Sequence, residues 1–415
     1  MPKTNMDYKA GSRFLQTGAG RPPPHAPRLR NLRARRRADF PALPAVYLDL
    51  AEKLSSPLRG GPPLCDELLA FVQHVFSEEE AAAARHLGSL RGRTAADLAR
   101  LERRPVEQVE PLLQRLATEK RVIAATGSGE QCTYRLLPVV PGMFEMCLVS
   151  HTLETLTDWH RRFIELFEVL YETGFALDYL GASTHTIRVL PVNRAIEAHP
   201  MALPSDHLET ILDRYRVFGI GQCQCRTTAE VLGRGCGRPR GNCLVMGRWA
   251  VSGIKQGALQ SVSRQAVLDL KREAEAHGLA NWLMNVESSR GQISCSCCGC
   301  CCHAFRLITE FNAPGLIAPP HFLPQFDAAR CSHCGRCAQI CPLNAIRLDA
   351  PQKSLQHLTE RCVGCGLCAV ACPARAVRMD AAPTYRPPYR NWLSLALGTA
   401  PRALRSVWNA WRKRG

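Results

Sequence analysis

The chain has 415 residues, a formal net charge of +17 at pH 7 and 21 cysteines, and 46% of its residues are hydrophobic. That length and composition suffice for two or three domains with buried cores. The size of the chain and the spacing of its cysteines exclude a small secreted protein held together by disulfides. The N-terminus lacks a signal-peptide pattern and no apolar run reaches the length of a membrane span, so we expect a cytoplasmic protein.

Residues 1–60 are predicted to form a basic, disordered arm. Residues 1–45 are rich in Pro, Gly and Arg and poor in large apolar side chains, and Arg28–Arg37 is strongly basic. The arm is open to three interpretations: a solvated extension, an upstream choice of start codon, or a nucleic-acid-binding tail. We favour the first two.

Residues 61–140 are predicted to form a helical domain that ends in a β-hairpin. Thr94–Asp97 has the pattern of a capping box, and Pro105 suits the first turn of a helix that runs to about Lys120. Two alternating runs, 121–126 and 131–136, follow. This order resembles a winged helix-turn-helix. We do not expect DNA as a partner, because Glu107 and Glu110 at the start of the second helix would repel phosphate.

Residues 141–325 are predicted to form a central, cysteine-rich α/β domain. Apolar residues at helical spacing predict a helix over 151–172, and alternation predicts a strand over 186–192. Ser205 is placed to cap a helix that runs to about Phe218, and a further helix is expected over 263–277.

Ten cysteines of this central domain are candidate metal ligands. They form a first group, Cys223, Cys225, Cys236 and Cys243, and a second group, Cys295, Cys297, Cys298, Cys300, Cys301 and Cys302. The first group could close a tetrahedral site for zinc or a cubane, or the two groups could share one or two clusters. We favour a further iron–sulfur cluster over zinc, and zinc over thiol–disulfide chemistry. Arg226, Arg234, Arg238 and Arg240 are interpreted individually as residues of a solvated loop, although cations there could raise a cluster potential or bind an anion.

Residues 326–380 contain one cysteine pattern written twice, C-x2-C-x2-C-x3-C-P. The first copy has Cys331, Cys334, Cys337 and Cys341, and the second has Cys362, Cys365, Cys368 and Cys372. This pattern indicates two [4Fe-4S] clusters, each of which takes its fourth cysteine from the other copy. A pair of zinc sites would also suit C-x2-C, but the three-plus-one spacing, its repetition and both prolines argue against zinc.

Residues 381–415 are predicted to form a basic amphipathic tail helix. Leu404, Val407, Trp408 and Trp411 fall on one helical face, with Arg and Lys around them. Such a helix can lie on an anionic membrane, dock on an acidic partner subunit, or pack on its own domain.

The segment 331–380 resembles a bacterial two-[4Fe-4S] ferredoxin domain. The order of parts over 64–380 is similar to a group of prokaryotic 4Fe-4S dicluster proteins, through the phrases Cys223–Arg226, Cys295–Cys302 and Gly364–Gly366. That wider resemblance implies iron–sulfur binding and electron transfer. The cysteine-dense stretch faintly resembles CCG-type sites of heterodisulfide-reductase-like enzymes, but its spacing differs and no catalytic residue is carried over.

The sequence therefore predicts a multidomain α+β protein with a ferredoxin-like C-terminal domain. We expect it to transfer electrons through two [4Fe-4S] clusters, as a subunit or partner of an anaerobic oxidoreductase. The alternatives are a reductase with a catalytic metal site at residues 295–303 and an iron–sulfur redox-sensing, winged-helix regulator. The expected partner is a redox protein, and the tail could add peripheral contact with the cytoplasmic face of a membrane.

Overall fold

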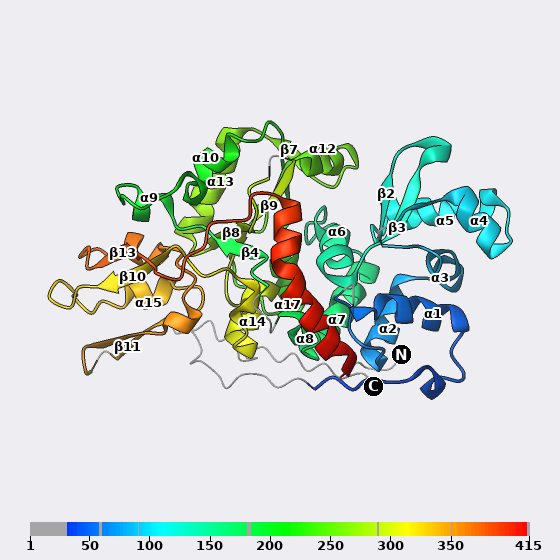
Figure 1. Cartoon of the computed structure of the whole chain (residues 1–415), viewed down its shortest axis with the longest axis horizontal. Helices are drawn as coiled ribbons and strands as arrows, with labels where there is room; N and C mark the ends of the chain where they lie inside the picture. The colour runs from blue at the N-terminus through cyan, green and yellow to red at the C-terminus, as the bar shows by residue number, and fades with distance from the viewer. Residues whose placement is uncertain are drawn as a thin grey trace. The chain divides into compact units, whose positions relative to one another are not determined.

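The computed structural model describes residues 31–57, 60–89, 91–180, 184–288, 290–349 and 351–412. They form a mixture of helices and strands, which confirms the predicted α+β class. The chain divides into two compact units (Figure 1): the N-terminal unit, mainly Leu29–Tyr179 with Arg405–Gly415, and the cysteine-rich unit, mainly Leu180–Leu404. No helix in the described part is both long enough and apolar enough to cross a membrane.

The N-terminal unit is mostly helical. Its elements are α1 (Ala45–Leu54), α2 (Asp66–Val75), α3 (Glu78–Ala84), β1 (Arg93–Thr94), α4 (Ala95–Glu102), α5 (Val106–Thr118), β2 (Ile123–Thr126), β3 (Thr133–Leu136), α6 (Phe144–Leu148), α7 (Asp158–Glu172) and α8 (Leu177–Leu180). The three strands form one antiparallel sheet in the order β1-β3-β2. Helices α2 and α7 pack together, with the rings of Phe71 and Phe163 5.2 Å apart.

Several local predictions for this unit hold. Thr94 caps α4 and forms a capping box with Asp97, and both predicted strands are present. The interpretation of these elements as a winged helix stays a prediction. The arm predicted over residues 1–60 is wrong for Ala45–Leu54, since α1 buries four apolar side chains there; residues 1–30 lie outside the described residues.

The cysteine-rich unit is built around one six-stranded sheet. Its elements up to the end of the central segment are β4 (Ile187–Val189), α9 (Asn193–Ile196), α10 (Leu208–Leu212), β5 (Phe218–Gly221), α11 (Gln224–Val231), β6 (Cys243–Gly247), α12 (Arg248–Lys255), β7 (Gln260–Val262), α13 (Arg264–Ala276), β8 (Ala280–Met284), β9 (Gly291–Cys297) and α14 (His303–Phe311). The strand order is β4-β8-β9-β6-β5-β7, and every pair is antiparallel.

This topology corrects two expectations. The central domain is not of the alternating α/β type, because a parallel sheet is absent from its described strands. The helix predicted from Ser205 to Phe218 is also wrong: α10 ends at Leu212 and Phe218 begins β5. The helix expected over 263–277 is present as α13, capped by Ser263, whereas α7 begins at Asp158 and not near residue 151.

The two faces of the sheet bury different partners. One apolar cluster joins strands β5, β6 and β8 to α10 and α13. The other joins β4, β8 and β9 to α14 and also to the segment that carries the duplicated cysteine pattern. The sheet therefore places that segment against the central cysteines.

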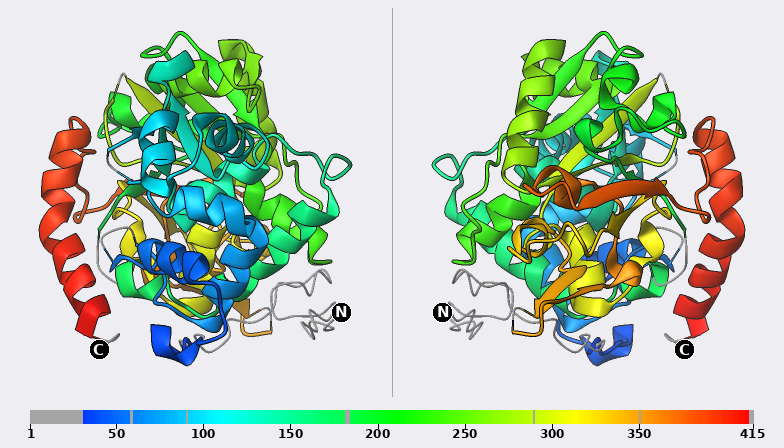
Figure 2. Two further views of the ribbon diagram at one scale, coloured as in Figure 1. Left: turned by 90° about the vertical axis from the view of Figure 1, so that its right-hand side faces the viewer. Right: turned by 90° about the vertical axis from the view of Figure 1, so that its left-hand side faces the viewer.

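The duplicated segment forms two short antiparallel ribbons (Figure 1; Figure 2, right). Its elements are β10 (Phe322–Phe326), α15 (Arg336–Ile340), β11 (Ile346–Asp349), β12 (Ser354–His357), α16 (Leu367–Val370) and β13 (Val377–Ala381), followed by α17 (Trp392–Arg412). Strand β10 pairs with β13 and β11 with β12, so each ribbon combines a strand from each copy. The tail prediction agrees with α17 from residue 392; residues 413–415 lie outside the described residues.

Candidate metal centres

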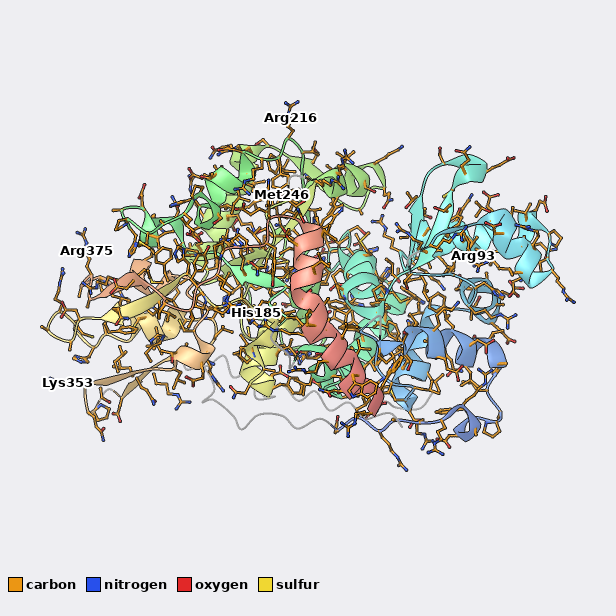
Figure 3. The ribbon with its side chains drawn as sticks, in the orientation of Figure 1. Arg93, His185, Arg216, Met246, Lys353 and Arg375 are labelled. Carbon is orange, nitrogen blue, oxygen red and sulfur yellow. The ribbon has the colours of Figure 1, made fainter. Side chains whose placement is uncertain are left out.

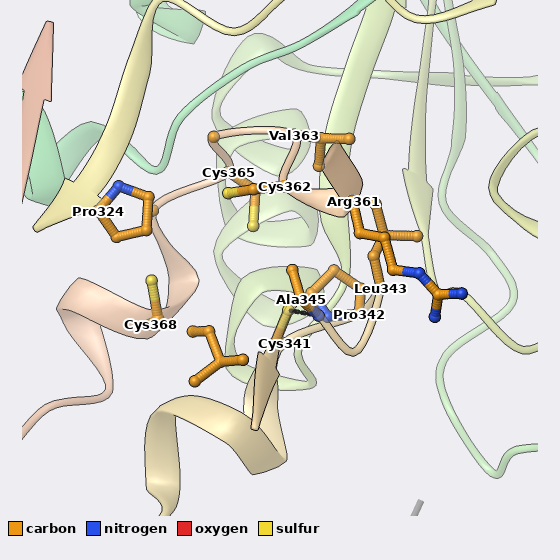
Figure 4. Close-up of a pocket in the computed structure, with 13 residues that line it drawn as sticks. Pro324, Cys341, Pro342, Leu343, Ala345, Arg361, Cys362, Val363, Cys365 and Cys368 are labelled. Carbon is orange, nitrogen blue, oxygen red and sulfur yellow. Dashed lines mark hydrogen bonds between the residues drawn. The ribbon is translucent and has the colours of Figure 1, made fainter. Parts of the chain in front are cut away.

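The eight repeated cysteines line two pockets, and each pocket draws on both copies. The inner pocket has Cys341 from the first copy and Cys362, Cys365 and Cys368 from the second. These residues surround a space of about 350 Å³ that includes part of the solvent. Figure 4 shows these four side chains directed toward a common space. The outer pocket has Cys331, Cys334, Cys337 and Cys372, around about 390 Å³. The structure thus brings together the sets that the sequence predicted.

The duplication extends to the backbone. Ala345 N–H donates to the Cys341 sulfur and Ala376 N–H donates to the Cys372 sulfur, both at 3.3 Å. Gly335 and Gly366, the equivalent residues that precede α15 and α16, have φ of 74° and 73°. Such positive φ values favour glycine, and they turn each loop so that its amide groups approach the pocket.

The two copies differ in their surroundings. At one pair of equivalent positions, both with positive φ, the first copy has His333 and the second has Gly364. A side chain at Gly364 would collide with the carbonyl oxygen of Phe322 on β10, so the inner loop has no room where the outer loop carries an imidazole. Cys334 of the outer pocket is exposed, whereas Cys341 and Cys368 of the inner pocket are buried. The outer pocket therefore has one exposed cysteine, whereas the cysteines of the inner pocket are buried or half-buried.

The inner pocket packs directly on the central domain. The Val192 amide donates to the Cys365 carbonyl oxygen at 2.9 Å. Leu343 and Val363 of the pocket wall share one apolar cluster with Cys297, Cys302 and Phe305. Gly299, between Cys298 and Cys300, lies so close to the backbone of Pro342 that an added side chain would collide with it. One continuous apolar cluster therefore lies between the inner pocket and the central cysteines.

The central cysteines do not divide as the sequence suggested. A six-sulfur set gathers at one end of the sheet, where each sulfur interacts with the next in the order Cys223, Cys225, Cys302, Cys297, Cys295 and Cys243. A four-sulfur set contains Cys236, Cys298, Cys300 and Cys301, whose sulfurs all lie within 4.8 Å of one another. Cys236 thus leaves the first sequence group, because the glycine-rich loop carries it away from the sheet end to the residues that precede α14.

Sheet and helix ends position the six-sulfur set. Cys295 and Cys297 share one face of β9, and Cys243 begins the neighbouring strand β6. Cys223 and Cys302 are the N-cap residues of α11 and α14, where unpaired amides and the helix dipole favour negative charge. His303 Nδ1 lies 3.3 Å from the Cys225 sulfur.

Two buried cations adjoin the six-sulfur set. Arg226 is 2% exposed and donates to the Ser296 carbonyl and to Asn242 Oδ1. Lys271, also 2% exposed, donates to Ser294 Oγ at 2.9 Å and Ser296 Oγ at 3.0 Å. Neither forms a salt bridge with a carboxylate of the described chain. Buried charges without counter-charge are costly, so thiolates are the fitting partners, and metal binding would make these cysteines thiolates.

Burial and hydrogen bonds shift the pKa values of groups in these sites. Burial lowers the pKa of Lys271 to about 8, although nearby cysteines act in the opposite direction. Hydrogen bonds from the thiols of Cys236, Cys300 and Cys301 hold the pKa of the Cys298 thiol well below its usual value. The four-sulfur set therefore favours the charged form of at least one member.

Sequence reasoning missed several residues of these sites. Arg226 and Arg234 were interpreted as residues of a solvated loop but are buried, and Lys271 was considered only as part of a helix. Trp282 was not singled out, yet its Nε1–H donates to the Cys297 sulfur at 3.1 Å across the β8–β9 ladder. Lys271 lies on the buried face of α13, and a charged residue at such a position could have indicated a site. The contact of Trp282 depends on strand register, which the sequence does not reveal.

Comparisons with known proteins bear on the duplicated segment alone. No curated protein and no solved structure matches the chain. Residues 326–382 match the family model described as the 4Fe-4S dicluster domain. This part of the chain is therefore a ferredoxin-like, iron–sulfur 4Fe-4S domain, and its cysteine pockets supply the thiolates that such a cofactor requires.

Proposed function

We propose that the protein is an electron carrier whose ferredoxin-like domain holds two [4Fe-4S] clusters. Cys331, Cys334, Cys337 and Cys372 would ligate one cluster, and Cys341, Cys362, Cys365 and Cys368 the other. A bound [4Fe-4S] cluster supplies a site for one-electron reduction and oxidation, with potentials that span about −700 to +450 mV across proteins. Support comes from the two pockets, each with three cysteines of one copy and the fourth of the other.

The observation that carries this proposal is the apolar wall between the inner pocket and the central domain. Leu343 and Val363, which line the inner pocket, belong to the same buried apolar cluster as Cys297 and Cys302. These side chains exclude water and connect the two groups of cysteines through one continuous apolar cluster. A purely structural role for this apolar cluster would not require cysteines on both sides of it.

We further propose that the six-sulfur set holds an additional iron–sulfur cluster, on the other side of this wall. Its sulfurs interact in sequence with one another and, within the described residues, contribute no compact group of the kind that holds a single ion. Arg226 and Lys271 supply buried positive charge beside it. Cys297 and Cys302 are each 3% exposed, which favours electron transfer over the alternative of a reductase that contacts its substrate there.

The redox partner is proposed to dock at the outer pocket, in the cytoplasm, as part of an anaerobic oxidoreductase. Cys334 is exposed, and the exposed Arg330, Arg336 and Arg375 follow or precede outer-pocket cysteines by one to three positions. Figure 3 shows Arg375 and Lys353 directed outward from this segment. A partner with a carboxylate-rich surface would complement this edge, and mutation of these arginines would slow association, most strongly at low salt.

We propose that α17 adds contact with an anionic membrane surface. Leu393, Leu397, Leu404, Trp408 and Trp411 are each more than half exposed, and Arg402, Arg405 and Arg412 flank them. Exposed tryptophans with basic neighbours suit the interface of an anionic bilayer. The full chain should sediment with phosphatidylserine vesicles but not with phosphatidylcholine vesicles, and Trp408→Ser with Trp411→Ser should abolish this. Binding only to an acidic protein would refute the membrane proposal.

Reciprocal ligation gives the decisive test of the electron-carrier proposal. In anaerobically reconstituted protein, Cys341→Ser should give the same EPR spectrum and loss of iron as Cys368→Ser, although these residues belong to different copies. Cys337→Ser, four residues from Cys341, should instead match Cys372→Ser. Wild-type protein should hold at least about eight iron atoms. The proposal fails if Cys341→Ser groups with Cys337→Ser, or if the protein binds no inorganic sulfide.

A further inference from the structure

The four-sulfur set differs in size from the two pockets of the ferredoxin-like domain. The sulfurs of Cys300 and Cys301 are 3.6 Å apart, those of Cys236 and Cys298 are 4.0 Å apart, and all four lie within 4.8 Å of one another. Within the described chain, neither the inner nor the outer pocket forms a group this compact. Those two sets instead surround open space.

Site size distinguishes one ion from a cubane. Tetrahedral zinc with Zn–S bonds of about 2.3 Å sets its four sulfurs about 3.8 Å apart. A [4Fe-4S] core places its cysteine sulfurs beyond the corners of a cube and so holds them farther apart. The contacts of 3.6 and 4.0 Å therefore match a single tetrahedral ion.

The surroundings of the four-sulfur set suit a tetrathiolate of net negative charge. Ala229, Ala274 and Leu279 pack around it and exclude water. The Arg238 guanidinium donates to the Cys300 sulfur at 3.8 Å and is held by the His277 carbonyl at 2.8 Å. Zinc with four thiolates carries two negative charges, and Arg238 supplies a fixed positive charge beside it.

We propose that Cys236, Cys298, Cys300 and Cys301 bind one zinc ion. Zinc has no redox chemistry, so this site is structural. It links the glycine-rich loop around Cys236 to the Cys298–Cys302 loop. In that second loop Gly299 lies against Pro342, and Cys302 belongs to the six-sulfur set. The ion thereby fixes the loop that forms the central side of the wall.

The metal content of the full chain, purified anaerobically from zinc-supplied cells, tests this inference. We expect one zinc per chain. Cys236→Ser should lose the zinc and retain the iron of the ferredoxin-like domain, whereas Cys243→Ser, the matched control from the six-sulfur set, should retain the zinc. Absence of zinc from the wild type, retention of the zinc in Cys236→Ser, or a spectrum of a single ferric tetrathiolate would each overturn it.

A second measurement covers the case in which Cys236→Ser fails to fold. Protein produced with Co²⁺ in place of Zn²⁺ should show the ligand-field bands of tetrahedral cobalt with four thiolates. A spectrum of octahedral or oxygen-ligated cobalt would overturn the site assignment. Failure here leaves the reciprocal pairs Cys341 with Cys368 and Cys337 with Cys372 unaffected, so the zinc inference and the proposed electron-carrier function fail separately.

Discussion

Gly366 and Gly335 form a matched pair that tests whether the inner pocket packs on the central domain. They occupy equivalent positions in the two copies, with φ of 73° and 74°. Alanine at either residue carries the same cost of left-handed backbone, about 1–2 kcal/mol. Their surroundings differ: an added Cβ at Gly366 would lie 2.9 Å from Ala195 Cβ, whereas one at Gly335 would lie 3.4 Å from the flexible end of Leu348.

The difference between the two variants isolates the packing cost. At 2.9 Å, Ala195 must shift, and overpacking of this kind adds about 1–3 kcal/mol. The contact at Gly335 is at van der Waals distance, so the cost of Gly335→Ala comes from the left-handed backbone alone. We therefore expect Gly366→Ala to destabilise the holoprotein by about 1–3 kcal/mol more than Gly335→Ala.

Anaerobic unfolding in guanidinium, followed by loss of the cluster absorbance of the full chain, measures this difference. Hydrogen exchange at Val192, whose amide donates to Cys365, should also accelerate in Gly366→Ala only. Equal destabilisation by the two substitutions, with unchanged exchange at Val192, would refute the packing of the inner pocket on the central domain. The electron route through the wall would then lose its basis.

Three further outcomes follow. Trp282→Phe removes an N–H donor to the Cys297 sulfur and should lower the reduction potential of a central cluster in an EPR-monitored titration, whereas Trp249→Phe should not. Lys271→Met removes a buried positive charge and should shift the same potential in the same direction; an upward shift would contradict the assigned environment. Burial, with smaller contributions from neighbouring histidines, lowers the pKa of His160 to about 4 from 6.5. Its neutral form is thus favoured in the fold, so stability present above pH 6.5 is lost as the pH falls toward 4. Between pH 7 and 5 His160 should contribute a loss of about 2 kcal/mol, measured by hydrogen exchange of α7 as the difference between the wild type and His160→Gln.

Much of the local structure could be predicted because its causes are local. The capping box at Thr94 depends on four residues, and the duplicated cysteine pattern fixes two loops through its own spacing. The error at Phe218 has a physical reason. Apolar spacing from Ile211 to Tyr215 continues a helical pattern, and Gly219 looks like a helix stop. Gly219 instead lies in β5, which pairs with β6 and β7, and the Leu259 side chain leaves little room there for a Cβ. Single-sequence patterns do not reveal such long-range approaches.

The division of the central cysteines could not be predicted for the same kind of reason. Nearness in sequence suggested that Cys236 belongs with Cys223 and Cys243. The structure places Cys243 beside β9 through strand pairing and carries Cys236 away on the loop to the residues that precede α14. Strand register and loop path decide which sulfurs meet, and neither is encoded in the cysteine spacing.

The contrast between His333 and Gly364 shows that the two copies in the ferredoxin-like domain have different surroundings. Two identical copies would present two equivalent surfaces to a partner protein. Here the first copy presents an imidazole and an exposed Cys334, while the second is closed by the Phe322 carbonyl, where even a methyl group would collide. The repeated cysteine pattern therefore stands in two unlike settings. The first copy leaves Cys334 accessible, and the second packs its loop tightly against β10 of its own chain.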